Sequence, residues 1–412
     1  MLDADRIREF GREAAARFES RGRAPAVFSA LATDLLRTAR LHEAIDPDVL
    51  LAELAGAADL GPQMDLTTRF ATPPVTVFQN DDFYIDVYFW LAPRTGVHSH
   101  GFTGAFTVLR GVSLHNVYTF DHERDYAGDV VVGRLCRAQT ELLRAGDVRT
   151  IHDGQAFIHQ VAHLSCPSVS LIVRNRFSGS DPAIFAYLAP EIGARSSSHL
   201  SAATPLRKLQ IARFLVESRH PRSDELVATM VAAATPLAAF WMLIEFSLAT
   251  QDLERTTRLV ESVGASRPPW TDSLLRSLAH ESRVSVDWTR LRDEGQRLFA
   301  SLAASVEDPA VIRRMITDYA PGRPVSQTVL EWVQSMRRGG IVDFDLNPTA
   351  EHVLEVYLTG GSEADACRAL SARFQVAAGS DLARDVRAFS EELAANPFLA
   401  PFVPDPPYLS QG

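Results

Sequence analysis

The spacing of apolar residues divides the chain into three stretches of different character. Over residues 1–65 apolar side chains recur every three or four positions, which is typical of helices that bury one face. Residues 66–195 change to short aromatic and β-branched runs separated by turn residues, which predicts strands. Helical spacing returns over residues 205–400, after a predicted linker at 193–201.

Eight runs in the middle stretch have strand character, and their length and spacing predict a β-sandwich or a jelly-roll barrel. We therefore predict an α+β fold class, in which a central jelly-roll β-barrel is flanked by an N-terminal helical segment and a mostly α-helical C-terminal domain. Within that last domain, helical spacing continues from Leu226 to Leu248. The strand-like runs are 75–78, 83–91, 106–109, 113–120, 130–135, 140–143, 156–161 and 168–173.

Length and composition limit the classes of protein. The chain has 412 residues, too many for one ordinary core, so two or three domains are expected. Its net charge of −10 argues against a general binder of nucleic acid or anionic membranes. No apolar run reaches membrane-spanning length, and the first residues lack the pattern of a secretion signal. The three cysteines are scattered, which fits a reducing compartment, so we expect a cytoplasmic protein.

The candidate chemistry lies in two histidine-containing segments of the β-rich stretch. His98 and His100 are spaced by two, so on a strand both imidazoles point to the same face. Two neutral imidazoles with a third nearby suit a first-row divalent metal better than Mg²⁺ or Ca²⁺. Taken alone, such a pair would equally fit an exposed polar pair.

These segments resemble the two motifs of the cupin family, and within it the thiol dioxygenases of the cysteine dioxygenase type. The first motif here is Gly96-Val97-His98-Ser99-His100, and the second runs from Gly146-Asp147-Val148 to His159-Gln160-Val161. The resemblance covers roughly residues 75–176. It implies a cupin barrel in which His98, His100 and His159 are the metal ligands.

The departures from the family pattern indicate a three-histidine centre. The usual cupin glutamate would fall at Gly104-Ala105, where no carboxylate stands. Three neutral imidazoles leave the charge of a divalent ion uncompensated, so an anionic substrate is expected at the open positions. An iron(II) ion with open coordination positions is expected to bind substrate and dioxygen together. Cysteine dioxygenases also carry a cysteine near Ala105, an upstream arginine and a tyrosine that falls here at Arg174, so free cysteine is a doubtful substrate.

Other polar residues are candidates for the same pocket. Arg174 or Arg176 would hold a substrate carboxylate by a bidentate pair, or form a salt bridge at the rim. Tyr88, with Asp86 and Trp90 on one strand face, is predicted to line the pocket or orient a ligand, although packing is the alternative for Trp90.

Three further histidines are candidates for a place in or near the same pocket. His163 lies four residues after His159 on the same strand face, where it is a candidate pocket acid or base. His115 and His152 are expected to be a satisfied barrel histidine and a turn residue, with a place near the metal as the alternative. The candidate catalytic residues are therefore His163, Tyr88 and Arg174.

A second resemblance covers residues 338–400. The run Asp345-Leu346-Asn347-Pro348 and the amphipathic run 382–393 are similar to the small winged-helix modules that grip leader peptides, such as the peptide chaperone of pyrroloquinoline quinone biosynthesis. The alternative is an ordinary helical cap. The resemblance implies a substrate carried on a peptide.

The favoured hypothesis is a mononuclear non-heme iron(II) oxygenase of the cysteine dioxygenase-like type, with a small anionic thiol or carboxylate substrate and dioxygen. One alternative is a non-catalytic ligand-binding or sensor module with a helical partner-binding domain. Others are a non-oxidative isomerase or lyase that uses zinc, nickel or manganese, and a tailoring oxygenase of ribosomal peptides. Neither nucleic acid nor membrane is expected as a partner, and a homodimer is left open.

Overall fold

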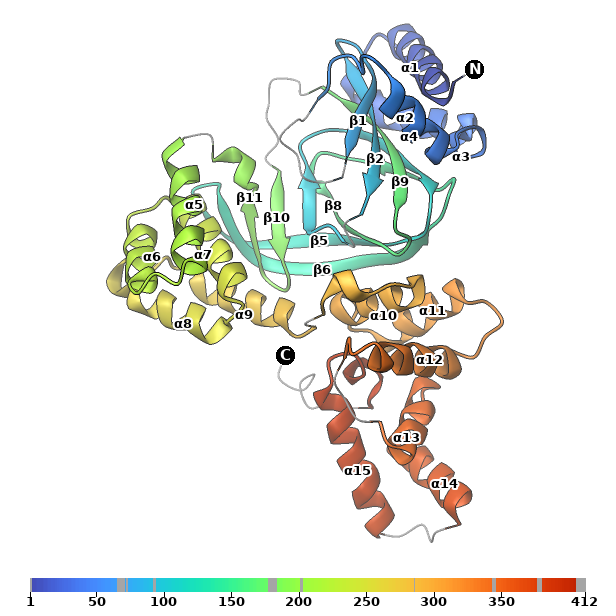
Figure 1. Ribbon diagram of the computed structural model, residues 1–412, viewed down its shortest axis with the longest axis vertical. Coiled ribbons are helices and arrows are strands. Elements are labelled where there is room, and N and C mark those ends of the chain that lie inside the picture. Colours follow the sequence, from blue (N-terminus) through green and yellow to red (C-terminus); the bar gives the residue numbers. More distant parts are fainter. Residues whose placement is uncertain are drawn as a thin grey trace.

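The computed structural model describes residues 2–64, 71, 73–91, 94–176, 184–200, 203–284, 286–342, 346–375 and 380–404. Its fold class is α+β, as predicted, because antiparallel sheets form the centre and helices flank them on both sides (Figure 1). One sheet has five strands, and six further strands close into a barrel.

The five-stranded sheet separates a helical core from the interior of the barrel. Its order is β1 (Pro74–Gln79), β2 (Phe83–Trp90), β9 (Ser168–Asn175), β4 (Gly104–Arg110) and β7 (Val148–Ile151). Alternate side chains of a strand point to opposite faces. Phe83, Ile85 and Val87 therefore pack against the N-terminal helices, whereas Tyr88 and Trp90 face inward.

Four helices cover the outer face of this sheet. They are α1 (Asp3–Ser20), α2 (Pro25–Ala39), α3 (Leu41–Ala44) and α4 (Pro47–Gly56). The residues with helical spacing in the sequence, Ile7, Phe10 and Phe18 among them, are buried in the shared core. This burial stabilises the scaffold that holds β2, β4 and β9 in place.

The six-stranded barrel contains the histidine motifs. Its order is β10 (Phe185–Leu188), β11 (Ile192–Arg195), β6 (Val130–Leu143), β5 (Ser113–Tyr126), β8 (Gly154–His163) and β3 (Val97–His100), and β3 pairs with β10 to close it. Two sequence predictions were wrong here. The runs 130–135 and 140–143 form one strand because β6 pairs with β5 along its whole length, and the predicted linker begins inside β11, which pairs with β6 and β10.

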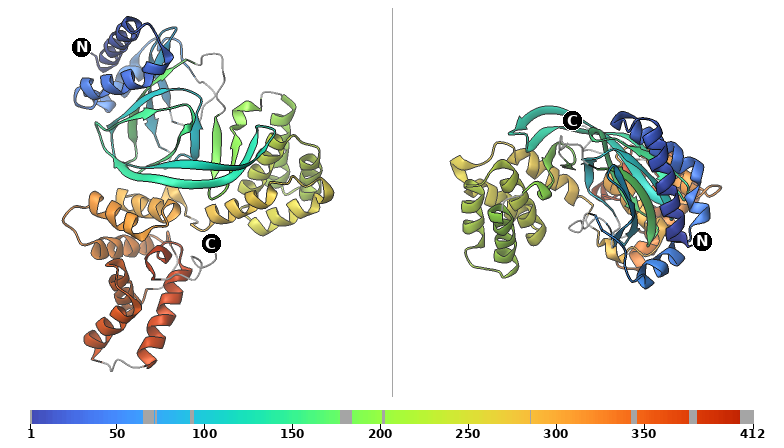
Figure 2. Two further views of the ribbon diagram at one scale, coloured as in Figure 1. Left: turned by 180° about the vertical axis from the view of Figure 1, so that it is seen from behind. Right: turned by 90° about the horizontal axis from the view of Figure 1, so that it is seen from above.

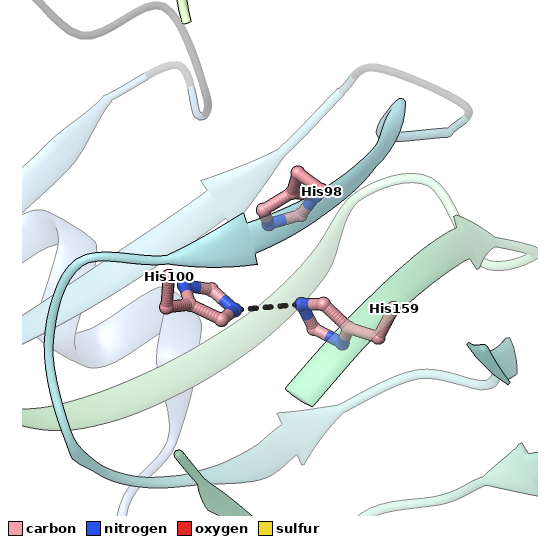
Figure 3. Close-up of side chains that lie close together, drawn as sticks. All are labelled: His98, His100 and His159. Carbon is pink, nitrogen blue, oxygen red and sulfur yellow. Dashed lines mark hydrogen bonds between the residues drawn. The ribbon is translucent and has the colours of Figure 1, made fainter. Parts of the chain in front are cut away.

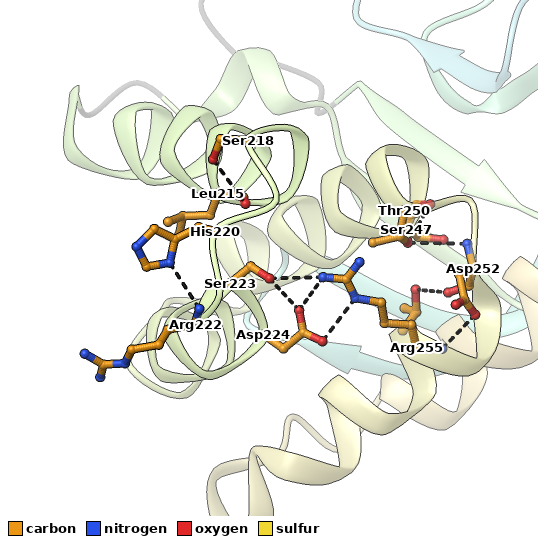
Figure 4. A network of polar contacts seen from close by, with 11 residues as sticks. Leu215, Ser218, His220, Arg222, Ser223, Asp224, Ser247, Thr250, Asp252 and Arg255 are labelled. Atoms are coloured by element: carbon orange, nitrogen blue, oxygen red, sulfur yellow. Dashed lines mark hydrogen bonds and ion pairs between the residues drawn. The ribbon is translucent and has the colours of Figure 1, made fainter.

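Beyond the barrel lies a bundle of five helices: α5 (Ala203–Glu217), α6 (Ser223–Ala232), α7 (Pro236–Thr250), α8 (Leu253–Ser262) and α9 (Thr271–Ser282). The continuous spacing from Leu226 to Leu248 is divided between two helices, because Thr235 caps α7 and Pro236 begins it. Within the bundle, Arg255 of α8 joins α8 to α6 by donating to Ser223 and Asp224 at 2.7–3.1 Å (Figure 4).

The remaining helices pack on the outside of the barrel wall and then extend away from it (Figure 2). They are α10 (Glu294–Ser305), α11 (Pro309–Tyr319), α12 (Val325–Arg338), α13 (Pro348–Leu358), α14 (Glu363–Phe374) and α15 (Ser380–Ala395). Leu114 of β5 with Ala162 and Leu164 at the end of β8 share one hydrophobic core with them. Within the described ranges, no helix is both long and apolar enough to cross a membrane.

Candidate metal centre

A cavity of about 820 Å³ lies between the two sheets, and all six predicted site residues line it. Its walls are largely aromatic and aliphatic, with a small set of polar groups that converge from both sheets, as is usual for ligand sites. The sequence predictions that meet in this one space are His98, His100, His159, Tyr88, His163 and Arg174.

The three histidines of the two motifs form a compact group (Figure 3). One nitrogen from each ring lies within 4.8 Å of the other two, and the ring centres are 4.7–4.9 Å apart. Nε2 of His100 and Nε2 of His159 are 2.9 Å apart. Two imidazole nitrogens bound at right angles to one metal ion, each at about 2.1 Å, would be about 3 Å apart. The nitrogens of His100 and His159 therefore have the separation of two ligands of one metal ion, with a nitrogen of His98 close to both.

The protonation of these rings also suits a metal. Burial is the main cause that lowers the pKa of His98, and it holds the pKa of His100 and His159 well below the usual range, with neighbouring imidazoles adding to the effect. The rings are therefore neutral at pH 7. Nδ1–H of His98 donates to the Gly96 carbonyl at 2.9 Å, so the lone pair of this neutral ring is on Nε2.

The carboxylate of the usual cupin has no place here. A Cβ atom at Gly104 would lie 2.0 Å from the carbonyl oxygen of Val173, so no side chain fits there without moving β9. Ala105 faces the core under the N-terminal helices instead of the cavity. Among the described residues, His98, His100 and His159 form a group that could hold a metal ion, and it contains no carboxylate.

Arg174 places a positive charge next to this group. Its guanidinium donates to the Tyr88 hydroxyl at 3.1 Å and lies 4.1 Å from the centre of the Phe102 ring, which is 4.8 Å from the His100 ring. The charge of Arg174 contributes to the lowered pKa of His100. Arg176, the alternative from the sequence, is used elsewhere, because it donates to the Asn80 carbonyl and to Gln79 at 2.6 Å.

His163 lies farther along β8. Its Nδ1 is 2.8 Å from the Ser168 hydroxyl and 3.2 Å from that of Ser113, and its ring stacks on Trp90 at 4.5 Å. Its buried Nε2 has no hydrogen-bond partner within the part of the chain that the structure describes. Burial lowers the pKa of His163 to about 3, so the ring is neutral at pH 7. It can therefore form a hydrogen bond with a substrate. At pH 7 it lacks the second ring proton, so it is not in the imidazolium form that acts as a general acid.

Sequence reasoning missed one part of the site, which lies behind His159. Nδ1 of His159 is 3.0 Å from Nε2 of His115, and Nδ1 of His115 is 2.9 Å from Glu141. Arg149 donates to the same carboxylate at 2.8 Å from Nε. His115 had been expected to be a satisfied barrel histidine, and it is, but its partner is a metal-ligand candidate. Only the pairing of β5 with β6 and β8 reveals this.

Of the other candidates, Trp90 lines the cavity, whereas Asp86 and His152 do not. Asp86 is buried and accepts a hydrogen bond from the Thr76 hydroxyl at 2.7 Å. His152 is exposed in the turn before β8. Trp90 combines packing with orientation, because it supports the His163 ring and donates to the Ser170 hydroxyl at 2.9 Å.

The similarities to known proteins include a family match near the C-terminal end and a solved structure. Residues 333–399 match the family described as Coenzyme PQQ synthesis protein D (PqqD), in agreement with the resemblance expected for 338–400. The described residues of that stretch form the end of α12 and helices α13, α14 and α15, with no strand that would make a wing.

The second similarity is to a crystal structure of hydroquinone 1,2-dioxygenase PnpCD in complex with Cd²⁺ and 4-hydroxybenzonitrile. The identity is 15%, the match covers 27% of this chain and 67% of that chain, and the TM-score is 0.20. A TM-score this low lends no support to a shared activity. No curated protein matches the chain.

Proposed function

We propose that the protein is a mononuclear non-heme iron(II) oxygenase, similar to cysteine dioxygenases in its three-histidine centre, that oxidises a small anionic substrate with dioxygen. The observation that carries the proposal is the convergence of three neutral imidazoles, with no carboxylate among them, beside the Arg174 guanidinium. Both features favour negative charge on the substrate.

The residues have separate roles in this proposal. His98, His100 and His159 hold the ion, which when bound supplies the redox chemistry that amino acid side chains lack. Arg174, oriented by Tyr88 and by the Phe102 ring, binds the carboxylate or other anionic group of the substrate. His163 offers a hydrogen bond to a part of the substrate farther from the ion, and the aromatic walls exclude water.

Metal analysis combined with oxygen uptake tests this function. The chain is purified anaerobically, supplied with Fe(II), desalted, and screened with small thiols and carboxylates in an oxygen electrode. Stoichiometric iron with substrate-dependent oxygen uptake is expected. Retention of zinc, nickel or manganese without oxygen uptake would favour an isomerase or lyase, and failure to retain any metal would favour a ligand-binding module.

A second candidate narrows the substrate to a side chain on a ribosomal peptide. The observation that favours it is the match of residues 333–399 to the PqqD family. The sequence of this stretch resembles modules that grip leader peptides. Helix α10 connects this stretch to the barrel, since both share one core. A peptide held by α13–α15 would then be tethered near the cavity at a raised effective concentration.

A displayed library of random peptides distinguishes the two candidates. Peptides enriched on the full chain, synthesised with an oxidisable thiol or carboxylate after the binding segment, should support faster oxygen uptake than the same group on a free amino acid. Equal rates for both would favour the small-molecule substrate.

A further inference from the structure

The histidine behind the candidate metal centre belongs to a continuous chain of polar contacts. We propose that His115, Glu141 and Arg149 act as positioning residues for His159 and fix its tautomer. Glu141 also supplies, through His115, the negative charge that a coordinating glutamate supplies directly in the usual cupin. The inference rests on the proposed function only in assigning a metal ion to His159.

The fold makes this chain of contacts rigid. β5 lies between β6 and β8, and His115 and Glu141 are direct register partners across β5 and β6. The His115 side chain is fully buried and reaches His159 at 3.0 Å and Glu141 at 2.9 Å. Because both contacts of His115 cross from β5 to a neighbouring strand, neither depends on a loop, while Arg149 reaches Glu141 from β7 of the other sheet.

The hydrogen bonds define where the protons lie. An ionised carboxylate only accepts, so Nδ1–H of His115 donates to Glu141. The proposal places a lone pair on Nε2 of His115, where it accepts from Nδ1–H of His159. The proton of His159 is thereby held on the side away from the cavity, and Nε2 of His159 presents its lone pair to the metal position.

The charges of Glu141 and Arg149 act in opposite directions on a bound cation. Glu141 carries a negative charge two hydrogen bonds from the ion and raises the basicity of His159 through His115. Arg149 forms an ion pair with that carboxylate and cancels part of its field. A purely structural salt bridge would lose stability whichever partner was removed, whereas this arrangement predicts that loss of Glu141 weakens metal binding and loss of Arg149 does not.

The test uses paired variants of the full chain and two metals, Fe(II) under anaerobic conditions and Co(II). Glu141→Gln keeps an acceptor for His115 but removes the charge, and it should weaken binding of both ions by about 10–100-fold. Arg149→Gln should leave affinity unchanged or increase it. Glu123→Gln and Arg134→Gln, at exposed positions of β5 and β6, repeat the charge changes away from the site and should stay within about twofold of the wild type.

A metal-free measurement avoids dependence on variants that fold poorly. Nitrogen NMR of the wild-type imidazoles should show the proton on Nδ1 of both His115 and His159. A proton on Nε2 of His159 would overturn the inference, as would wild-type affinity in Glu141→Gln or equal weakening in Glu141→Gln and Arg149→Gln.

The outcomes also separate this inference from the oxygenase. If the wild type binds metal and the variants behave as expected but no oxygen is consumed, only the oxygenase proposal fails. If oxygen is consumed and Glu141→Gln binds metal as the wild type does, only the positioning role fails. A wild type that binds no metal would remove both.

Discussion

His98 and His159 lie directly opposite each other in the antiparallel pair of β3 and β8, although the two motifs are far apart in the sequence. The register shifts between His98 and His100, so that His100 pairs with Gly154 while its ring remains 4.9 Å from that of His159. Three rings from only two strands therefore lie close together.

Each of the three histidines should be required for metal retention. His98→Ala, His100→Ala and His159→Ala are each expected to lower the bound iron by more than about tenfold, because loss of one imidazole leaves two neutral ligands. Metal content after desalting gives the measurement. His152→Ala, an exposed histidine in the turn before β8, is the matched control and should bind as the wild type does. Full iron content in any of the three variants would remove that residue from the ligand set.

Arg174 should determine affinity for an anionic substrate. Arg174→Gln is expected to raise the KM for such a substrate by a factor that corresponds to about 1.5–3 kcal/mol of binding free energy, the range for a hydrogen bond to a charged group. Tyr88→Phe removes only the acceptor that orients the guanidinium and should cost about 0.5–1.5 kcal/mol. Arg176→Gln, outside the cavity lining, should leave KM unchanged. A KM in Arg174→Gln equal to that of the wild type would show that the anion binds elsewhere.

His163 should make the fold sensitive to acid. Its pKa is about 3 in the folded protein, against an unfolded value of about 6.5. A group whose folded pKa is lower takes up its proton on unfolding, so the free energy of unfolding falls as the pH drops from about 6.5 towards 3 and is unaffected above that window.

Urea titrations across this pH range give the measurement. His163→Asn, which cannot titrate but keeps an amide near Ser168, should reduce the slope by up to about 1.4 kcal/mol per pH unit, and His152→Asn should not. An unchanged slope in His163→Asn would mean that the ring already gains its proton in the folded state.

Gly104 should resist any side chain. Gly104→Ala would place Cβ 2.0 Å from the Val173 carbonyl oxygen, so β4 and β9 must separate, at a cost of about 1–3 kcal/mol or more. Gly96→Ala is the matched control, since a Cβ there meets nothing within 4 Å. Equal urea midpoints for the two variants would contradict the close strand contact that excludes a glutamate from position 104.

The sequence alone was sufficient for the fold class and for most of the candidate site. Strand character and the spacing of histidines along one strand are local properties of the sequence. Because side chains alternate along a strand, His98 and His100 share one face, as do His159 and His163, and all four line the cavity. The division of the chain into helical and β-rich stretches is local in the same sense.

What the tertiary structure decided was pairing between distant strands. Arg174 lines the cavity and Arg176 does not, because one lies opposite Gly104 and Tyr84 within the sheet and the other lies beyond the last residue of β9. Glu141 is paired with His115 by the register of β5 on β6. A strand's sequence determines which residues share a face, but which strand lies beside it depends on packing of the whole barrel, and no local pattern encodes that choice.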